Sequence, residues 1–576
     1  MSGKPIHRPW PRFSFQDRRR PVGEGRKGVS KEPRPSWPGG WAIVLALLVL
    51  LASLGARSGQ GASQSSRWQL RIHPVGPWYV GDVLSWEVRS PGPGLPGDAR
   101  VQIQVDPPAG PQWEATLAAW GIDQVQAAVV PWAWETDGET PGVHVVTVRY
   151  RGQEVLRQRL YLFPSSLRPF SERGVAWAEW VTACCQVVYF TQTETQRDLP
   201  ELLATTEAVY AEVTQRMGVQ PGQRAVIVFL PRLLGQGGFL AGEMWVTYRD
   251  RGPLMEPVRQ IVYHEMVHWV EGKGVKNWRP TMLVEGLAVY LSGGHYRPHE
   301  PLFRRAHAVL LWGRYQPLSV LGEDFYQHQH ELSYIQAGAL VAYMVERWGW
   351  ERFWAFYTSL EAPEQGETQM QALSRQLEVR FGQTLDALDR DLRTFLEQHP
   401  ATPDDLEDVQ VTVALYEALR AYQKAMDPDA YYGTAWLPRR EVMQPRGIVT
   451  DAIRSPNTAL HQTAELLLQQ ASLAWLRGDY PEARRYVEEV ETLVDAYRRG
   501  EAIPWERLPE ARRFRRWVAW AWGCGGELQR LDVHADPPRA QVRPRWRAPE
   551  LETWVLPTAD RPRACPAPFG EVTRQR

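Results

Sequence analysis

Two histidines and a glutamate lie inside the otherwise apolar stretch RQIVYHEMVHWVEG, residues 259–272. Apolar residues recur through this stretch at helical spacing, so most of the predicted helix has to be buried. His264 and His268 are four residues apart and therefore share one face of that helix. Buried imidazoles and carboxylates cost free energy unless they find partners. Any fold of this chain has to bring such partners to this helix.

The spacing of these three residues is that of the H-E-x-x-H motif. The two histidines of such a motif bind zinc from consecutive helical turns, and its glutamate acts as general base on a zinc-bound water. His264 and His268 are thus the predicted ligands, and Glu265 is the predicted base. A chance match in an ordinary helix is the alternative interpretation. The apolar surroundings favour the metal site, because one Zn²⁺ would use all three polar side chains.

A third ligand is expected downstream, since a catalytic zinc takes three protein ligands and keeps one position open for water. The stretch MLVEGLAVYLSGG holds Glu285 among apolar residues. Gly272 and Gly274 follow the first helix and Pro280 opens the second, so two antiparallel helices could turn Glu285 toward the histidines. A solvated surface glutamate is the alternative interpretation. We predict Glu285 as the third ligand.

These motifs resemble those of the gluzincin zinc metallopeptidases, most closely the peptidase MA-like branch related to membrane-alanyl-type aminopeptidases. The matching segments are HEMVH, VEGLAVY, SYIQAGALVAYMVERWG from Ser333 and FGQTLDALDRDLRTFL from Phe381. The resemblance implies a helix-rich half with the zinc motifs and a small sheet whose edge strand lies along the substrate. It also implies one Zn²⁺ per chain, with roles for five residues: the ligands His264, His268 and Glu285, the base Glu265, and the oxyanion-stabilising Tyr334.

An oxyanion would need a hydrogen-bond donor besides the metal. Tyr334 offers a phenol, and His328 or His330 in YQHQHELSY offers an imidazolium. Each has an ordinary alternative. The tyrosine could simply pack at the start of an apolar helix, and either histidine could be structural.

Two features depart from the family pattern. The tryptophan usually found just ahead of the glutamate ligand is displaced to Trp278, and a clear exopeptidase signature of the Gly-Ala-Met-Glu-Asn type is missing. The nearest stretch is LAGEMWVTY, whose Gly242, Glu243 and Met244 would lie on an edge strand beside the substrate. An ordinary alternating strand with a surface glutamate explains the stretch equally well. The sequence therefore gives no support to aminopeptidase specificity.

The N-terminal part differs in kind from the rest. Residues 1–40 are basic and rich in proline, which predicts a disordered tail. Residues 41–56, WAIVLALLVLLASLGA, form an apolar run that is either a signal-peptide core or a membrane anchor. We favour an uncleaved single-pass anchor, which places the rest of the chain outside the cytoplasm. Cleavage of the run would instead release an exported soluble form.

The remaining chain predicts a multidomain α+β protein. Short alternating runs in residues 66–165 predict an immunoglobulin-like β-sandwich, and residues 171–399 hold the predicted zinc metallopeptidase domain. Residues 403–530 predict a helical domain that contains one tetratricopeptide-like hairpin and could bind protein partners. Residues 531–576 form a tail rich in proline and arginine with one candidate strand.

The net charge and the four cysteines constrain the predicted function only weakly. The 66 basic and 66 acidic residues cancel, so nucleic acid is not a predicted partner. Cys184 and Cys185 are adjacent on a predicted strand and would point to opposite faces. Cys524 and Cys565 could form a disulfide in an oxidising compartment, and free thiols are the alternative.

The sequence thus predicts a zinc-dependent peptidase that cleaves peptide or protein substrates outside the cytoplasm, by Glu265-assisted attack of a zinc-bound water. Endopeptidase and aminopeptidase action stay unresolved. One alternative is a catalytically silent gluzincin fold that serves as a binding or scaffold protein at the membrane surface. Another is a zinc hydrolase with a substrate other than a peptide.

Overall fold

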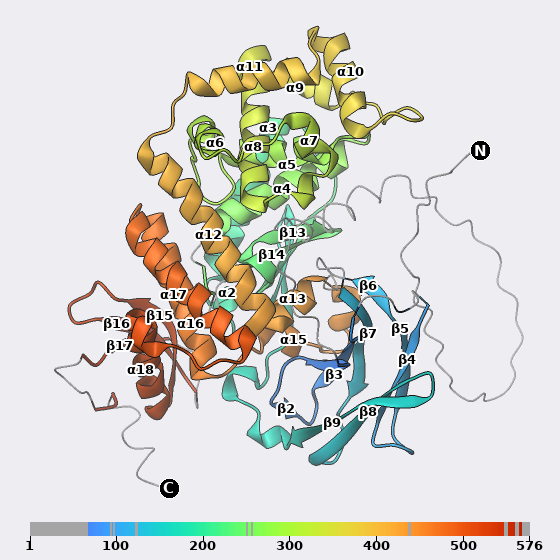
Figure 1. The fold of residues 1–576 in the computed structure, drawn as a ribbon, viewed down its shortest axis with the longest axis vertical. Coiled ribbons are helices and arrows are strands. Elements are labelled where there is room, and N and C mark those ends of the chain that lie inside the picture. The colour runs from blue at the N-terminus through green and yellow to red at the C-terminus, as the bar shows by residue number, and fades with distance from the viewer. Residues whose placement is uncertain are drawn as a thin grey trace, which may run out of the picture. The chain divides into compact units, whose positions relative to one another are not determined.

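The computed structural model describes residues 67–92, 95, 98–120, 125–248, 252–254, 257–435, 439–545, 551–558 and 564–566. The predicted basic tail and the apolar run of residues 41–56 lie outside this part of the chain. No helix in the described part is both long and apolar enough to cross a membrane. The described residues form a multidomain α+β protein, as predicted (Figure 1).

The first domain consists of nine strands in two sheets, ordered β1-β3-β7-β6 and β2-β9-β8-β4-β5. Leu84 and Trp86 of one sheet share a hydrophobic core with Ile103 and Val148 of the other. Inward side chains from both sheets fill this core, which is the packing expected of strands that alternate apolar and polar residues. The strands are β1 (Gln69–His73), β2 (Trp78–Tyr79), β3 (Val83–Arg89), β4 (Arg100–Val105), β5 (Gln112–Thr116), β6 (Ala118–Trp120), β7 (Val125–Glu135), β8 (Gly142–Tyr150) and β9 (Gln153–Phe163).

A separate five-stranded sheet, ordered β10-β11-β12-β14-β13, contacts helix α4 (Val258–Gly274), which carries the H-E-x-x-H motif, through β13 and β14. Its central strands β11 and β12 are parallel and nearly all apolar, because both of their faces are covered. Val187 and Ile227 face the main helical core, whereas Val188 and Val228 face a smaller one. The strands are β10 (Trp177–Val181), β11 (Cys185–Phe190), β12 (Ala225–Leu230), β13 (Gly238–Ala241) and β14 (Glu243–Thr247).

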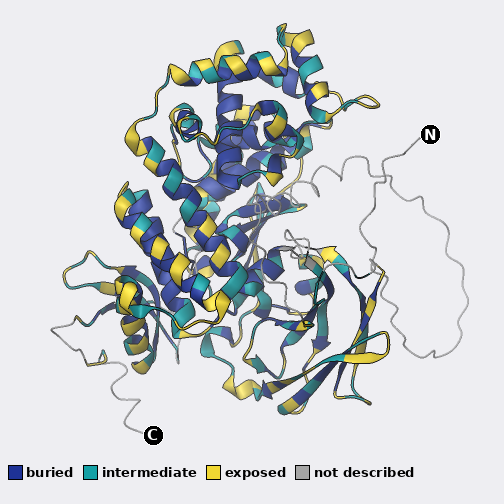
Figure 2. Cartoon of the chain, viewed as in Figure 1, coloured by how far each residue is buried: buried dark blue, intermediate teal, exposed yellow. Residues whose placement is uncertain are grey.

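Ten α-helices of the described chain belong to this region. Helices α3 and α4 contact the sheet, α5 packs on α4, and α8 packs on α5. Figure 2 shows that α4, α5 and α8 are buried along most of their length. The helices are α2 (Glu194–Arg197), α3 (Leu199–Met217), α4 (Val258–Gly274), α5 (Thr281–Ser292), α6 (Leu302–Leu311), α7 (Leu318–Glu323), α8 (His330–Trp348), α9 (Trp350–Tyr357), α10 (Gln369–Phe381) and α11 (Leu385–Glu397).

Helix α12 (Pro403–Met426) belongs to two hydrophobic cores at once. Val409 and Val413 pack in the core that contains α4 and α8, whereas Leu415 and Leu419 pack in the core of the C-terminal helices. The C-terminal region is therefore joined to the helices of the H-E-x-x-H motif through one continuous helix. Its other helices are α13 (Pro428–Ala435), α14 (Arg440–Met443), α15 (Thr450–Ile453), α16 (Ala459–Leu476), α17 (Tyr480–Arg499) and α18 (Pro509–Gly523).

A small antiparallel sheet follows α18 where the sequence predicted helix and then a tail with one strand. It consists of β15 (Gly526–Asp532), β16 (Arg539–Pro544) and β17 (Glu552–Val555). Leu528, Val542 and Trp554 pack into the core of the C-terminal helices. The prediction missed β15 and β16 because arginine and proline obscured their short apolar alternation.

Both predictions about the cysteines can now be compared with the structure. Cys184 lies just before β11 and is disulfide-bonded to Cys185, so the prediction that the two point to opposite faces of a strand is wrong. Cys524 and Cys565 form the second disulfide, one of the two alternatives that the sequence left open.

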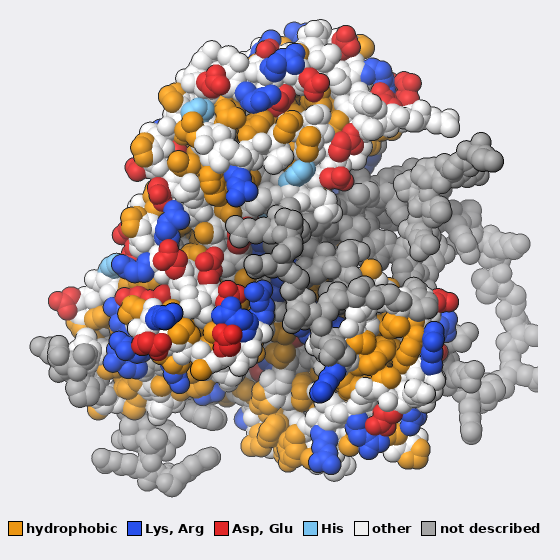
Figure 3. Space-filling view, in the orientation of Figure 1, with side chains coloured by type: hydrophobic (Ala, Val, Ile, Leu, Met, Phe, Trp, Pro, Cys, Tyr) orange, Lys and Arg blue, Asp and Glu red, His pale blue; other side chains and the backbone are white. Residues whose placement is uncertain are grey.

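Both signs of charge mix on the surface. On the face that Figure 3 draws, Lys and Arg side chains lie among Asp and Glu, with small hydrophobic areas between them. This mixture is what a chain with 66 basic and 66 acidic residues leads one to expect.

Buried ion pairs join the two-sheet domain to the C-terminal region. Arg454 donates to Asp82 over 2.8 Å and to Glu172 over 2.6 Å. His73 of β1 lies between Glu87, at 2.9 Å, and Asp429 of α13, at 2.6 Å. All six groups are shielded from water, so losing a partner would leave buried charge uncompensated. These buried ion pairs thus hold the two-sheet domain to the C-terminal region.

We expect the stability of this junction to fall in mild alkali. Burial lowers the pKa of His73, but its hydrogen bonds to the Asp429 and Glu87 carboxylates outweigh burial and raise that pKa to about 9. A pKa raised above its unfolded value gives stability that is complete below pH 6.5 and disappears as the pH rises through 9. The contribution is on the order of 3 kcal/mol. Melting temperatures between pH 6 and 9.5 should therefore decline in the native protein.

His73→Phe is the matched control, because it keeps the ring stacked on Tyr432 and removes the titrating group. We expect this variant to be less stable at neutral pH and to lack the decline between pH 7 and 9.5. An equal decline in both proteins would contradict the assignment to His73.

Candidate metal centre

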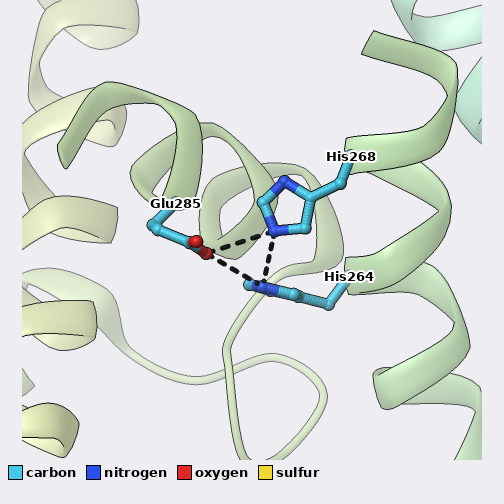
Figure 4. A group of neighbouring side chains, drawn as sticks. All are labelled: His264, His268 and Glu285. Carbon is cyan, nitrogen blue, oxygen red and sulfur yellow. Dashed lines mark hydrogen bonds and ion pairs between the residues drawn. The ribbon is translucent and has the colours of Figure 1, made fainter. Parts of the chain in front are cut away.

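Three side chains of two helices converge on one point (Figure 4). His264 and His268 extend from α4, and Glu285 extends from α5. The Nε2 atoms of the two histidines are 3.1 Å apart. Oε2 of Glu285 lies 3.1 Å from Nε2 of His268 and 3.3 Å from Nε2 of His264. The sequence predicted these same three residues as ligands.

The spacing of these three atoms fits a metal ion. Ligand atoms about 2.0 to 2.1 Å from a tetrahedral zinc lie roughly 3.3 Å from one another. The three observed separations of 3.1 to 3.3 Å match that value. Imidazole nitrogens and a carboxylate oxygen also form a donor set that suits zinc and several other divalent ions. The group can therefore hold a metal ion, and the donors alone do not choose which.

Electrostatics favour the charged forms of Glu285 and His268, whereas burial lowers the pKa of His264. Burial opposes ionisation of Glu285, but His268 and His264 hold the pKa of its carboxyl well below the ordinary value. Burial likewise lowers the pKa of His268, and Glu285 outweighs it and raises that pKa to about 9. A divalent ion would take over the role of the imidazolium proton, so metal binding should release a proton near neutral pH.

The loop between α4 and α5 is fixed by a second buried cluster. Glu271, near the end of α4, accepts hydrogen bonds from Arg279 over 2.7 Å and from the Tyr357 hydroxyl over 2.5 Å. Asn277 in the same loop donates to the Tyr357 and Leu360 carbonyls. These contacts tie the loop to the end of α9.

Helices α5 and α8 approach closely because each presents a glycine to the other. Gly286 of α5 faces α8, and Gly338 of α8 faces α5. A Cβ atom added to Gly286 would lie 2.4 Å from the Ala337 carbonyl oxygen, and one added to Gly338 would lie 2.4 Å from Val289. Backbone atoms cannot move aside as a flexible side chain would. The glycine that follows Glu285 thus lets the ligand helix reach its position.

We expect Gly286→Ala to lower the free energy of unfolding by about 3 kcal/mol, because an extra methyl group must push the two helices apart. Metal affinity should fall as well, since Glu285 is the adjacent residue. Gly272→Ala is the matched control, because nothing lies within 4 Å of its added Cβ. Chemical denaturation and chelator competition measure the two effects. Equal stability of both variants would contradict the close approach.

Tyr326 is a neighbour of the ligands that the sequence analysis missed. It lies in the short 3-10 helix Phe325–Gln327, and its hydroxyl donates to Oε1 of Glu285 over 2.7 Å. Both side chains are buried. The hydrogen bond leaves Oε2 to face the histidines, so Tyr326 orients the carboxylate as a ligand through one oxygen.

We expect Tyr326→Phe to weaken metal binding by about ten-fold, because the orientation of Glu285 would be lost while all three ligands stay. Competition with a chelator of known affinity measures the change. Tyr315→Phe is the matched control, since it removes a tyrosine hydrogen bond of 2.8 Å to a different carboxylate, Asp389. An equal effect of the two variants would remove Tyr326 from the ligand environment.

Glu265, the predicted base, lies beside the triad and is itself buried. Burial raises the pKa of its carboxyl to about 8, and the charge of Glu285 adds to the rise. A bound cation would lower this pKa again. Gly238 of strand β13 lies next to it, since an added Cβ there would be 3.0 Å from Cγ of Glu265. Strand β13 therefore runs past the predicted base.

Tyr334 is buried next to the triad. Its ring centre is 6.0 Å from that of His264 and 4.2 Å from that of His295, on which it stacks. Burial and the charge of Glu285 raise the pKa of its hydroxyl well above the ordinary value, so the phenol keeps its proton. His295 was another residue missed from the sequence, although it follows closely on the motif that contains Glu285.

The two other candidate donors have different surroundings. His330 is buried with its ring centre 4.5 Å from that of Tyr334. Burial lowers the pKa of His330 to about 4, so it is a neutral ring rather than the predicted imidazolium. His328 pairs with the Val320 carbonyl at 3.2 Å, outside this cluster. Tyr334 is thus the donor best placed among the three.

The prediction that Glu243 and Met244 lie on an edge strand is wrong. Glu243 and Met244 lie on β14, which is paired on both sides, by β12 and by β13. On this side of the sheet the edge strand is β13, a run of four residues that the sequence analysis did not recognise. Glu243 is ion-paired with Arg440 of α14 through three hydrogen bonds. Its carboxylate is therefore already engaged by a cation of this chain.

Comparison of the chain with models of known families finds no match, and comparison with curated proteins finds none either. Fold and site together define the class: a multidomain α+β protein that carries a candidate metal centre. Within the described residues, that centre is the His264, His268 and Glu285 triad.

Proposed function

We propose that this protein is a zinc-dependent peptidase of the gluzincin type. The observation that carries the proposal is the convergence of His264, His268 and Glu285 within 3.1 to 3.3 Å, with the buried Glu265 beside them. A carboxylate next to a metal triad is what a hydrolase needs and a purely structural metal site does not. The motif resemblance to the peptidase MA-like branch supports the same function.

The chain's own residues would divide the work as follows. When bound, zinc supplies Lewis acidity and makes water a nucleophile near neutral pH. Glu265 would take the proton from the attacking water and pass it to the departing amine. Tyr334 would donate a hydrogen bond to the oxyanion, whose charge develops only in the transition state.

Strand β13 would hold the substrate. One side of it pairs with β14, and among the described residues the other side pairs with no strand. An extended peptide could add to that edge, and main-chain hydrogen bonds would bind it regardless of its sequence. Because Gly238 lies against Glu265, such a peptide would pass close to the base.

The test is cleavage of a diverse peptide mixture by the full chain with added zinc, analysed by mass spectrometry. Products should appear with the native protein and not with Glu265→Gln. Internal cuts would establish an endopeptidase, and cuts at the first bond would establish an aminopeptidase. If the folded, zinc-loaded protein leaves every peptide intact, the result would favour one of the two alternatives. These are a silent scaffold with the same fold and a hydrolase with a different substrate.

The proposal also covers where the N-terminal segment places the protein. A single-pass anchor at residues 41–56 would place the peptidase on the outer face of a membrane. Protease protection of the full chain in sealed vesicles tests this placement.

A further inference from the structure

Helix α12, from the C-terminal region, reaches the candidate site through a buried ion pair. Nη1 and Nη2 of Arg420 donate to the two carboxylate oxygens of Glu331 over 2.6 and 2.9 Å. The Glu331 side chain is fully buried, and that of Arg420 is 7% exposed. Such a two-pronged pair fixes both distance and orientation. It ties α12 to the first turn of α8.

Tyr334 is attached to this turn. It follows Glu331 by three residues and so lies one helical turn further along the same side of α8. A second route leads from α12 to the same tyrosine. Tyr416 packs on Tyr296, with ring centres 4.7 Å apart, and Tyr296 contacts the ring of His295, which stacks on Tyr334. Helix α12 thus supports Tyr334 from two directions.

We propose that Arg420 is a positioning residue of the candidate metal centre. Acting through Glu331, it holds the first turn of α8 so that the Tyr334 hydroxyl stays beside Glu285. The inference rests on the proposed function, in which Tyr334 serves the reaction. It also means that the C-terminal helical region is part of the site's construction and not only a surface for protein partners.

Three variants separate positioning from stability: Glu331→Gln, Arg420→Met and the two combined. Each single variant leaves one buried group without its partner and should lower the melting temperature. The double variant removes both charges, so its melting temperature should recover toward that of the native protein. If Arg420 positions Tyr334, kcat of the double variant stays about ten-fold below the native value, with KM little changed. Recovery of kcat together with the melting temperature would overturn the proposal.

Hydrogen exchange of residues 328–337 gives a readout that needs no activity. In the double variant, amides in this first turn of α8 should exchange faster than in the native protein. Arg347→Met is the control, because Arg347 lies at the far end of the same helix and its pair with Asp391 of α11 is exposed. It should change neither exchange in this turn nor kcat.

The two readouts also keep this inference distinct from the proposed function. A native protein that cleaves no peptide would defeat the peptidase proposal, while exchange in residues 328–337 would still decide whether Arg420 holds the turn. Unchanged exchange in the double variant would overturn the positioning role even in an active enzyme.

Discussion

Glu265→Gln should lower kcat/KM for peptide cleavage by about a thousand-fold while the protein keeps its metal. Glutamine has nearly the shape of glutamate but cannot accept the proton of the attacking water, and a positioned base typically contributes a hundred- to ten-thousand-fold. Glu265 lies outside the three converging ligand atoms. Metal content should therefore stay at one ion per chain.

The measurement pairs peptide cleavage with metal analysis of the same protein sample. Glu212→Gln is a control, since it removes an exposed carboxylate that pairs with Arg259 of the same helix α4. It should change neither quantity. Turnover that survives in Glu265→Gln would show that the base is another group, and loss of metal from it would show that Glu265 helps to hold the ion.

The convergence of His264, His268 and Glu285 could be predicted because local rules connect these residues. His264 and His268 share a helix face because they are four residues apart, and the apolar residues around them required burial. Glu285 could be predicted because glycines and a proline marked a turn between two helices. In each case the spacing along the chain determined the spacing in the structure.

Tyr326 could not be predicted in this way. It is 41 residues beyond Glu285, and its short 3-10 helix reaches the ligand only through the packing of α7 and α8 around α5. Arg420 is further still, 89 residues from Glu331. Side chains of this kind support the site through tertiary contacts, for which a single sequence carries no periodic signal.

The errors in the fold also have physical causes. The run EMWVTY has the alternation of a strand. Nothing in the sequence indicates that the shorter run GFLA pairs with it and forms the edge of the sheet. Strands β15 and β16 carry charged residues on their exposed positions and few apolar ones, so their pattern is weak. The helical hairpin of α16 and α17 lies where the pattern predicted it, because a turn at Gly478 and Asp479 separates two long amphipathic segments.

Glu285→Ala should weaken metal binding by at least a hundred-fold, more than the ten-fold expected of Tyr326→Phe. The variant removes one of three donor atoms, whereas Tyr326 only orients that donor. Two histidines four residues apart would remain, and they can bind a divalent ion only weakly. Chelator competition and metal analysis after dialysis measure the loss.

Glu271→Ala is the matched control for this experiment, because it also removes a buried carboxylate from the same pair of helices. Glu271 pairs with Arg279 and Tyr357 instead of facing the histidines. This variant should lose stability, since Arg279 would be left without its partner, and should still bind one metal ion. Native metal affinity in Glu285→Ala would exclude Glu285 as a ligand, and equal metal loss in both variants would point to a general collapse of the α4–α5 junction. The predicted pattern, in which the metal is lost from one variant and retained by the other, would make the triad a specific site and not a product of burial alone.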